Sequence, residues 1–405
     1  MPSQLNTYLR QKLETLESAH LYRRRRVVTS AQGRRIRVDA RTLLNFCSND
    51  YLGLANDPRV IRVFKQAADD FGVGSGASHL VSGHSRPHHQ LEQDLASFTG
   101  RERALVFSSG YSANMAVIRS LVSVGDAVFQ DRLNHASLLD GGWMSRANVQ
   151  WFEHRHYLHL QQQLNQLPKE GRENRLIISD GVFSMDGDCC DVSALVHLAK
   201  SHKAWLMIDD AHGFGVLGAK GVGCVDPQSY SSDEVPILIG TLGKAFGTAG
   251  AFVAGSEELI EWLIQKARNY IFTTAMPSAV ALASLQSLQI IKTETWRREH
   301  LLSLIDRFVC GAKQLGLPLL PSTTPIQPLL LKDPAHSLAL SEILEQRGIF
   351  ASAIRPPTVP TNSARIRITL SAAHTEKDID YLLDQLGDVF ACVGNLTVLE
   401  KQINE

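Results

Sequence analysis

The stretch "AWLMIDDAHG", residues 204–213, changes from apolar to polar at its centre. A short apolar run that ends abruptly in polar residues is typical of a buried strand that stops at a turn. Three other stretches have the same character: "RALVFSSG" at 103–110, "LIISDG" at 176–181 and "VPILIGTLGK" at 235–244. The repeated pattern predicts strands that are buried on both faces and end in polar turns.

Helical patterns separate these runs. The segments at 58–72, 87–100, 111–125 and 191–203 have helical periodicity, and in the first two we expect the final glycine to cap the helix. Glycine commonly ends a helix because it adopts left-handed backbone conformations. Strands that alternate with helices predict an α/β fold with a mostly parallel central sheet flanked by helices.

The character of the chain changes near residue 290. Residues 1–50 predict an N-terminal helix (3–22) followed by an arm, and residues 51–290 form the large α/β domain. Residues 291–405 predict a smaller α+β domain. Its strands are expected in "IQPLLL", "FASAIR" and "ARIRITL", and a final helix is expected to open at Thr375-x-x-Asp378.

The composition narrows the function classes. The 405 residues carry 41 basic and 41 acidic side chains, so net charge gives no attraction to nucleic acid or anionic membranes. No apolar run is long enough to span a bilayer, and residues 1–17 do not resemble a signal peptide. The six cysteines make no C-x-x-C pair, and the histidines do not combine with cysteines at zinc spacing. We expect a cytoplasmic protein with free thiols and no metal.

The chemistry gathers where the strands end. In parallel sheets the carboxyl ends meet at one edge, which is where ligands bind. At this edge Ser109, Gly110 and Tyr111 are predicted to begin a helix, and the first N–H groups of a helix can bind phosphate. Asp209 and His212 follow another predicted strand. Lys244 lies among small residues in "IGTLGKAFGTAGAF". A lysine amine, an acid and a phosphate seat together predict pyridoxal phosphate chemistry.

The sequence resembles a known family in several motifs. These are "SNDYLGL", "GSGASHLVSGHS", "LNHASLLDG", "GVFSMDGD", "DDAHGFGVLG", "GTLGKAFG" and "IRPPTVP…ARIRITLSAAHT". They are similar to the α-oxoamine synthases, which are fold-type I pyridoxal phosphate enzymes, over roughly residues 20–390. The resemblance implies a homodimer with shared active sites that condenses an amino acid with an acyl thioester. "IRPPTVP" favours the members that use L-alanine and a pimeloyl thioester carried by coenzyme A or acyl carrier protein.

The resemblance also implies roles for cofactor-binding residues. Lys244 matches the lysine that forms the imine, and partial desolvation is expected to lower its pKa. Asp209 matches the partner of the pyridine nitrogen, His212 the donor to the ring oxygen, and His135 the ring that stacks on the cofactor. The remaining matches are to residues that contact the cofactor. Four of them contact the cofactor of their own chain: Gly110, Tyr111, Ser184 and Thr241. Two of them contact the cofactor of the partner subunit: Thr273 and Thr274.

Substrate contacts follow from the same resemblance. Arg355 matches the arginine that binds the amino-acid carboxylate, with Thr358 beside it. Arg23 matches a substrate arginine that we assign to the distal carboxylate of the acyl group. Asn49 lies in the motif that approaches the bound amino acid.

Alternatives remain at this point. "GVGSGA", residues 72–77, fits a dinucleotide-binding pattern, but it follows a predicted helix rather than a strand. A P-loop is excluded because Ala245 replaces the required Ser or Thr. A sister enzyme such as a glycine C-acetyltransferase, or a binding protein that has lost catalysis, stays open. Considered without its neighbours, His135 is most simply interpreted as a turn histidine with ordinary hydrogen bonds and no role in cofactor binding.

Overall fold

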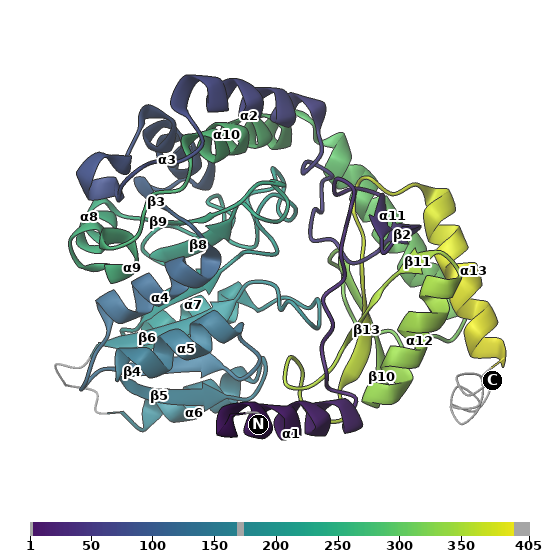
Figure 1. Cartoon of the computed structure of the whole chain (residues 1–405). Coiled ribbons are helices and arrows are strands. Elements are labelled where there is room, and N and C mark those ends of the chain that lie inside the picture. Colours follow the sequence, from purple (N-terminus) through teal and green to yellow (C-terminus); the bar gives the residue numbers. More distant parts are fainter. Residues whose placement is uncertain (1–2, 168–173, 393–405) are drawn as a thin grey trace. The chain divides into compact units, whose positions relative to one another are not determined.

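The computed structural model describes residues 3–167 and 174–392. The chain divides by contact into two compact units, shown with their elements in Figure 1. The large unit comprises Asn49–Ser184 and Asp188–Glu299, and the small unit comprises Met1–Ser48, Met185–Gly187 and His300–Glu405.

A seven-stranded sheet forms the centre of the large unit, in the order β3-β9-β8-β7-β6-β4-β5. Neighbours from β8 through β7, β6 and β4 to β5 are parallel, whereas β9 is antiparallel to both β3 and β8. The predicted mostly parallel sheet is therefore confirmed. The strands are β3 (Arg103–Phe107), β4 (Ala127–Asp131), β5 (Asn148–Phe152), β6 (Arg175–Asp180), β7 (Trp205–Asp209), β8 (Ile237–Thr241) and β9 (Ala251–Gly255).

The helices of the large unit begin and end largely where the sequence signals them. Gly100 ends α3 in a left-handed conformation, and the Asp191 carboxylate accepts the Ala194 N–H to cap α7. The helices are α2 (Pro58–Phe71), the π-helical turn η1 (His79–Gly83), α3 (Arg86–Thr99), α4 (Gly110–Leu121), α5 (Ala136–Ser145), α6 (Tyr157–Asn165), α7 (Val192–Ser201), α8 (Glu257–Lys266), α9 (Arg268–Ile271) and α10 (Ser278–Thr293).

Two apolar clusters cover the two faces of this sheet. Alternate residues of one strand point to opposite faces, so Leu176 and Ile178 pack in the cluster that includes α4. Ile177 packs in the other cluster, with residues of α6 and α7. Burial on both faces explains why the central strands β6, β7 and β8 are mainly apolar and why polar residues collect at their ends.

The small unit is α+β, as expected. Its two three-stranded sheets have the orders β1-β2-β11 and β10-β13-β12. The elements are α1 (Gln4–Ser18), β1 (Arg35–Val38), β2 (Arg41–Asn45), residues 300–314 of α11 (Trp296–Gln314), β10 (Ile326–Lys332), α12 (Pro334–Gln346), β11 (Ile349–Phe350), β12 (Ser352–Ile354), β13 (Ala364–Thr369) and α13 (Glu376–Cys392).

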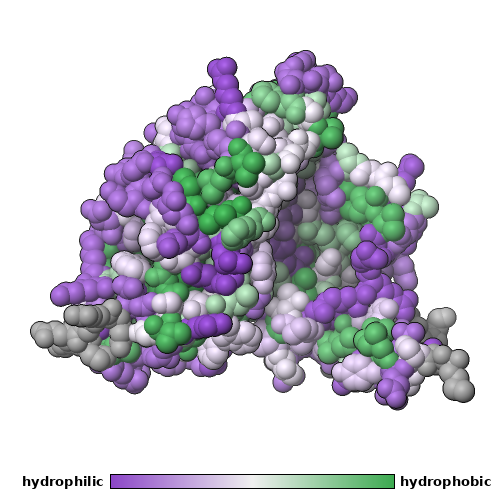
Figure 2. Space-filling view, turned by 60° about the vertical axis from the view of Figure 1, so that its left-hand side comes forward, coloured by the Kyte–Doolittle hydropathy of each residue, from purple (hydrophilic) through white to green (hydrophobic). Residues whose placement is uncertain are grey.

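The surface mixes hydrophilic areas with scattered apolar patches on the face shown in Figure 2. Within the described ranges, no helix is both long and apolar enough to cross a membrane. The five cysteines whose side chains are described, Cys47, Cys189, Cys190, Cys224 and Cys310, are free thiols.

Candidate active site

A cavity of about 170 Å³ lies in the large unit, where strands of the sheet end and helices α4 and α5 begin. It brings together every cofactor residue predicted within one chain. These are Gly110, Tyr111, His135, Ser184, Asp209, His212, Thr241 and Lys244. The cavity is also lined by Asn114, Ser137, Asp180 and Ala211.

Asp209 is the last residue of β7 and is buried. Its Oδ2 accepts a hydrogen bond from Nδ2 of Asn114 at 2.6 Å, and its Oδ1 accepts from the Ala211 N–H at 3.0 Å. Two donors therefore fix the carboxylate beside the cavity. A buried, oriented carboxylate of this kind suits a cationic ring nitrogen.

His135 precedes α5 and is held by one hydrogen bond that its backbone donates and one that its ring accepts. Its N–H donates to Oδ2 of Asp180 at 2.6 Å, and its Nδ1 accepts from the Ser137 N–H at 3.3 Å. Burial lowers the pKa of His135, opposed by Asp209 and reinforced by Lys244. The ring is therefore a neutral, flat surface, which suits stacking on an aromatic ring.

Asp180 occupies on β6 the place that Asp209 occupies on β7, since the two are paired in the sheet. Burial and the nearby Asp209 raise the pKa of Asp180 well above its ordinary value. Burial therefore disfavours the charged form of Asp180, and the hydrogen bond from the His135 backbone N–H partly offsets that effect.

His212 is linked to the "SNDYLGL" segment. Its Nδ1 lies 2.6 Å from the hydroxyl of Tyr51, which in turn lies 3.3 Å from Oδ1 of Asn49. When Tyr51 donates to Nδ1, the proton of His212 is on Nε2. That tautomer makes His212 the hydrogen-bond donor that the sequence predicts.

Tight backbone packing explains the small residues around Lys244. Gly247 has φ +66°, and a Cβ there would lie 2.2 Å from the backbone nitrogen of Ala55. The Gly247 N–H donates to the carbonyl of Lys244 at 2.8 Å. Thr241 donates from Oγ1 to the Gly250 carbonyl at 3.0 Å and closes the other end of the loop. The glycines therefore allow the loop that presents Lys244.

The start of α4 is the predicted phosphate-binding position. Ser109 caps the helix by accepting the Ser112 N–H at 3.1 Å. The first N–H groups of a helix have no intrahelical acceptor, and the helix dipole favours an anion there. Gly110 and Tyr111 both line the cavity at this end.

Thr273 and Thr274 do not line the cavity in this chain. They follow α9, and Thr274 forms an isolated antiparallel bridge with Ser78. Their assignment to a neighbouring subunit's cofactor stays a prediction.

The substrate residues Arg23, Arg355 and Thr358 come together in the small unit, in a cavity of about 240 Å³. Arg23 donates to Oγ1 of Thr358 at 3.3 Å, and Arg355 donates to the backbone carbonyls of His20 and Tyr22. Burial and the nearby Arg23 lower the pKa of Arg355. The described lining residues include three arginines and no acid, so this cavity suits an anion.

Comparison with known proteins decides the family. The model of the family "Aminotransferase class I and II" matches residues 41–386. The chain is 55% identical over 93% of its length to an 8-amino-7-oxononanoate synthase of Pseudomonas syringae pv. syringae, covering 94% of that protein. It is 56% identical over 95% of its length to the synthase of Saccharophagus degradans, covering 97% of it. The chain belongs to this family, in its 8-amino-7-oxononanoate synthase branch.

Solved structures agree with this assignment. A serine palmitoyltransferase of S. paucimobilis with bound PLP has a TM-score of 0.90 at 28% identity, covering 97% of this chain and 100% of that chain. An 8-amino-7-oxononanoate synthase of Francisella tularensis has a TM-score of 0.75 at 29% identity, covering 87% and 99%. The predicted fold class, enzyme class and pyridoxal phosphate cofactor are confirmed.

The residues present fit pyridoxal phosphate. Lys244 offers an amine, Asp209 a fixed carboxylate, and α4 its first N–H groups. Oδ1 of Asn114 is buried without a hydrogen-bond partner among the described residues. An acceptor left unpaired in a polar cavity indicates a site that a polar ligand completes.

Four lining residues were not assigned a role from sequence. Asp180 had a visible signal, because "LIISDG" ends in an acid just as "AWLMIDD" does. Asn114 and Ser137 lie near the starts of α4 and α5, where many polar residues occur without function. Their hydrogen bond at 2.9 Å joins two helices that only the fold brings together.

Proposed function

We propose that the chain joins L-alanine to a pimeloyl thioester and releases carbon dioxide, the free thiol and 8-amino-7-oxononanoate. The observation that carries this proposal is the set of Lys244, Asp209, His212 and His135 in one cavity, in a chain more than half identical to proteins named for this activity. The thioester carrier is coenzyme A or acyl carrier protein.

Pyridoxal phosphate, when bound, supplies an electron sink for the pair of electrons left on the alanine Cα. Lys244 lines the cavity and its amine would hold the cofactor there before alanine binds. Asp209 keeps the ring nitrogen protonated, and Nε2–H of His212 donates to the ring oxygen. Ser184 and Thr241 contact the cofactor, and the N–H groups at Gly110 and Tyr111 hold its phosphate.

The chain's own groups then move the protons. The amine of Lys244, free after alanine has bound, removes the proton from Cα and later returns one to it. The face of His135 holds the reacting group flat. The condensation makes a β-keto acid, whose carboxylate leaves as carbon dioxide, so carbons and electrons balance without any oxidant.

The arginine cavity of the small unit selects carboxylates. Arg355 binds the α-carboxylate of L-alanine, with Thr358 contributing to that contact, and Arg23 binds the distal carboxylate of the pimeloyl chain. Guanidinium groups recognise carboxylates through paired hydrogen bonds. The hydrogen bonds that these two guanidinium groups donate go to neutral oxygens, namely the Thr358 hydroxyl and the carbonyls of His20 and Tyr22, so these contacts leave their positive charge for a substrate anion.

We further propose a homodimer in which Thr273 and Thr274 reach the partner's phosphate. Three large apolar side chains near these threonines and the bridged Ser78 segment are strongly exposed in the single chain. They are Val73 (87%), Val81 (79%) and Phe272 (70%). Burying such side chains favours association. Sedimentation of the holoenzyme tests this: twice the 44.7 kDa chain mass supports it, and a monomer opposes it.

A comparison of substrates distinguishes this reaction from that of a sister synthase. Holoenzyme is given L-alanine, glycine or L-serine, each with pimeloyl or acetyl thioester, and products are identified by mass. We expect 8-amino-7-oxononanoate from alanine with the pimeloyl donor at the highest kcat/KM. Faster turnover of glycine with the acetyl donor would assign the chain to the sister enzymes, and no product from any pair would indicate a binding protein.

A further inference from the structure

A group of histidines and one glutamate lies outside the active-site cavity, around the start of α3. His79 and His84 come from η1 and the residue after it, and His88, His89 and Glu92 come from α3. Two sets of three could hold a metal ion: His79 with His84 and His88, or His84 with His89 and Glu92. In each set the ligand atoms lie within 4.8 Å of one another.

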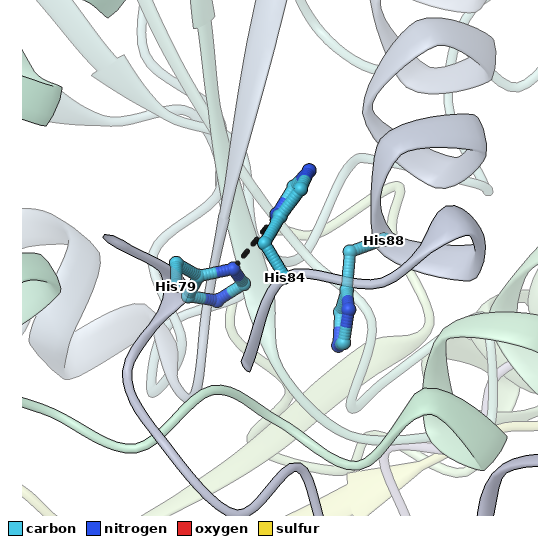
Figure 3. Close-up of side chains that lie close together, drawn as sticks. All are labelled: His79, His84 and His88. Carbon is cyan, nitrogen blue, oxygen red and sulfur yellow. Dashed lines mark hydrogen bonds between the residues drawn. The ribbon is translucent and has the colours of Figure 1, made fainter. Parts of the chain in front are cut away.

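The hydrogen bonds of His88 exclude the first set. Its Nε2 lies 2.7 Å from the carbonyl of Met276, which only accepts, so Nε2 carries the proton. The other nitrogen, Nδ1, accepts the Ser85 N–H at 3.1 Å. His88 therefore has no free lone pair for a metal. Figure 3 shows His79 and His84 meeting through one hydrogen bond, while His88 makes no such bond to either.

The second set is less firmly engaged: Nε2 of His89 lies 3.1 Å from the amide nitrogen of Gln93, an exposed side chain that can turn away. His89 and Glu92 are three residues apart on α3, so they share one face of the helix. Nε2 of His84 faces Oε2 of Glu92 at 4.0 Å, and the other carboxylate oxygen accepts the Val106 N–H at 3.0 Å. We propose that His84, His89 and Glu92 bind one divalent transition-metal ion, Zn²⁺ by preference.

The distances are close to those of a metal site. Three atoms no more than 4.8 Å apart all lie within about 2.8 Å of a common point, whereas zinc binds nitrogen and oxygen at about 2.0–2.2 Å. Closing that gap takes a small shift of each side chain. His84 and His89 are exposed, so their side chains can move and water can fill the fourth position.

The neighbours of His84 support a ligand role. A metal-binding histidine usually donates its second ring N–H to a nearby acceptor, which orients the ring. Nδ1 of His84 lies 3.0 Å from Nδ1 of His79, whose ring stacks on Tyr270 at 4.8 Å. When His84 donates to His79, its Nε2 has the lone pair that faces Glu92. Two imidazoles and one carboxylate are a ligand set that zinc accepts.

This site was not expected from the sequence, which offered no cysteine and histidine at zinc spacing. Its ligands are two histidines and a glutamate from a loop and a helix. The bound ion would join η1 to α3 in the large unit. It has no part in the condensation.

Zinc titration of the holoenzyme tests the site. Protein freed of metal by a chelator is titrated with Zn²⁺ against a chromophoric competitor. We expect one ion per chain, with the affinity lowered at least tenfold in His89→Ala and in Glu92→Gln. Glu92→Gln keeps the size of the side chain and an oxygen for the Val106 N–H. His197→Ala, at an exposed histidine of α7, is the matched control and keeps wild-type affinity.

Two results would overturn the proposal. One is zinc affinity that is the same in wild type, His89→Ala and Glu92→Gln. The other is an affinity lost in His79→Phe and kept in His89→Ala, which would place the ion at the other set. Co²⁺ in place of Zn²⁺ gives a spectrum without a thiolate charge-transfer band if the ligands are those proposed, and with one if a cysteine binds instead.

Discussion

The hydroxyl of Tyr51 lies between Nδ1 of His212 and Oδ1 of Asn49 and has one proton to give. Donated to His212, that proton places the histidine's own proton on Nε2, where our proposal needs a donor to the cofactor. Tyr51→Phe removes the donor, so the two tautomers of His212 redistribute. We predict a fall in kcat of about tenfold, equivalent to about 1.4 kcal/mol, with the cofactor still bound.

Nitrogen NMR of His212 is the readout that separates this role from a purely structural one. The expected result is a shift from the Nε2–H form toward a mixture in Tyr51→Phe, with thermal unfolding little changed. An unchanged His212 spectrum together with unchanged kcat would refute the assignment.

Arg355 and Arg23 share one cavity but are assigned to different substrates. Arg355→Ala should raise the KM for L-alanine at least tenfold, because a paired guanidinium–carboxylate contact is lost. Arg23→Ala should raise the KM for the pimeloyl thioester instead. Steady-state kinetics with each substrate varied in turn measures both.

Arg24 is a matched control for this pair. It lines the same cavity, but its guanidinium bonds Glu17 at 2.9 Å. Arg24→Ala should therefore leave both KM values within about threefold, since a surface ion pair contributes less than about 1 kcal/mol. Two arginine variants that affected alanine alone would show the role of Arg23 to be wrong.

At the scale of elements, Gly247 determines the loop after β8. Gly247→Ala combines a left-handed backbone with a clash against Ala55. Gly316 has nearly the same φ, +65°, but a Cβ there meets nothing within 4 Å. We predict that Gly316→Ala costs about 1 kcal/mol of stability, while Gly247→Ala costs several and abolishes activity. Equal melting temperatures for the two variants would contradict this account of the loop.

His154 connects the ends of two strands. It donates to Asp131, the last residue of β4, and to Asp188, each at 3.0 Å. Burial lowers its pKa, but the two carboxylates outweigh burial and raise it to about 9. Because the folded pKa exceeds the unfolded value of about 6.5, this stabilisation is complete below pH 6.5 and is lost as pH rises through 9.

Urea unfolding at pH 6 and pH 9.5 measures how much protonated His154 contributes to the free energy of unfolding. The wild type should lose up to about 3 kcal/mol relative to His154→Gln over this range. Parallel pH curves for the two proteins would mean that His154 has its ordinary pKa.

Several elements show where sequence prediction reaches its limit. "FASAIR", residues 350–355, was expected to be a strand, and residues 352–354 of it do form one, which pairs with β13. Phe350 instead belongs with Ile349 to β11, which pairs with β2. The antiparallel direction of β9 depends on its neighbours, so its own residues do not reveal it. β5 is a half-exposed edge strand, and its sequence lacks the apolar run that identified β6 and β7. The strand ends and helix starts that form the cofactor cavity were predictable. Burial on both faces makes a strand apolar, so the change to polar residues marks its end in the sequence.

At the scale of the whole molecule, contacts between residues far apart in the sequence determine which segments belong to the same compact unit. Residues before 49 belong with those after 299, and β2 pairs with β11 across about 300 residues. No local pattern encodes such a pairing. Arg23 and Arg355 could therefore be placed in one cavity only by resemblance, whereas Asp209 and Lys244 follow from strands that the sequence shows directly.

The central claim is that this chain carries out a decarboxylating condensation, and carboxyl-labelled L-alanine tests it most directly. The holoenzyme receives labelled alanine with and without pimeloyl thioester, while carbon dioxide and free thiol are measured together. We predict one labelled carbon dioxide for each thiol released, only when the thioester is present, and neither product from Lys244→Ala. Conversion of alanine to pyruvate without thiol release would contradict the account and indicate an aminotransferase.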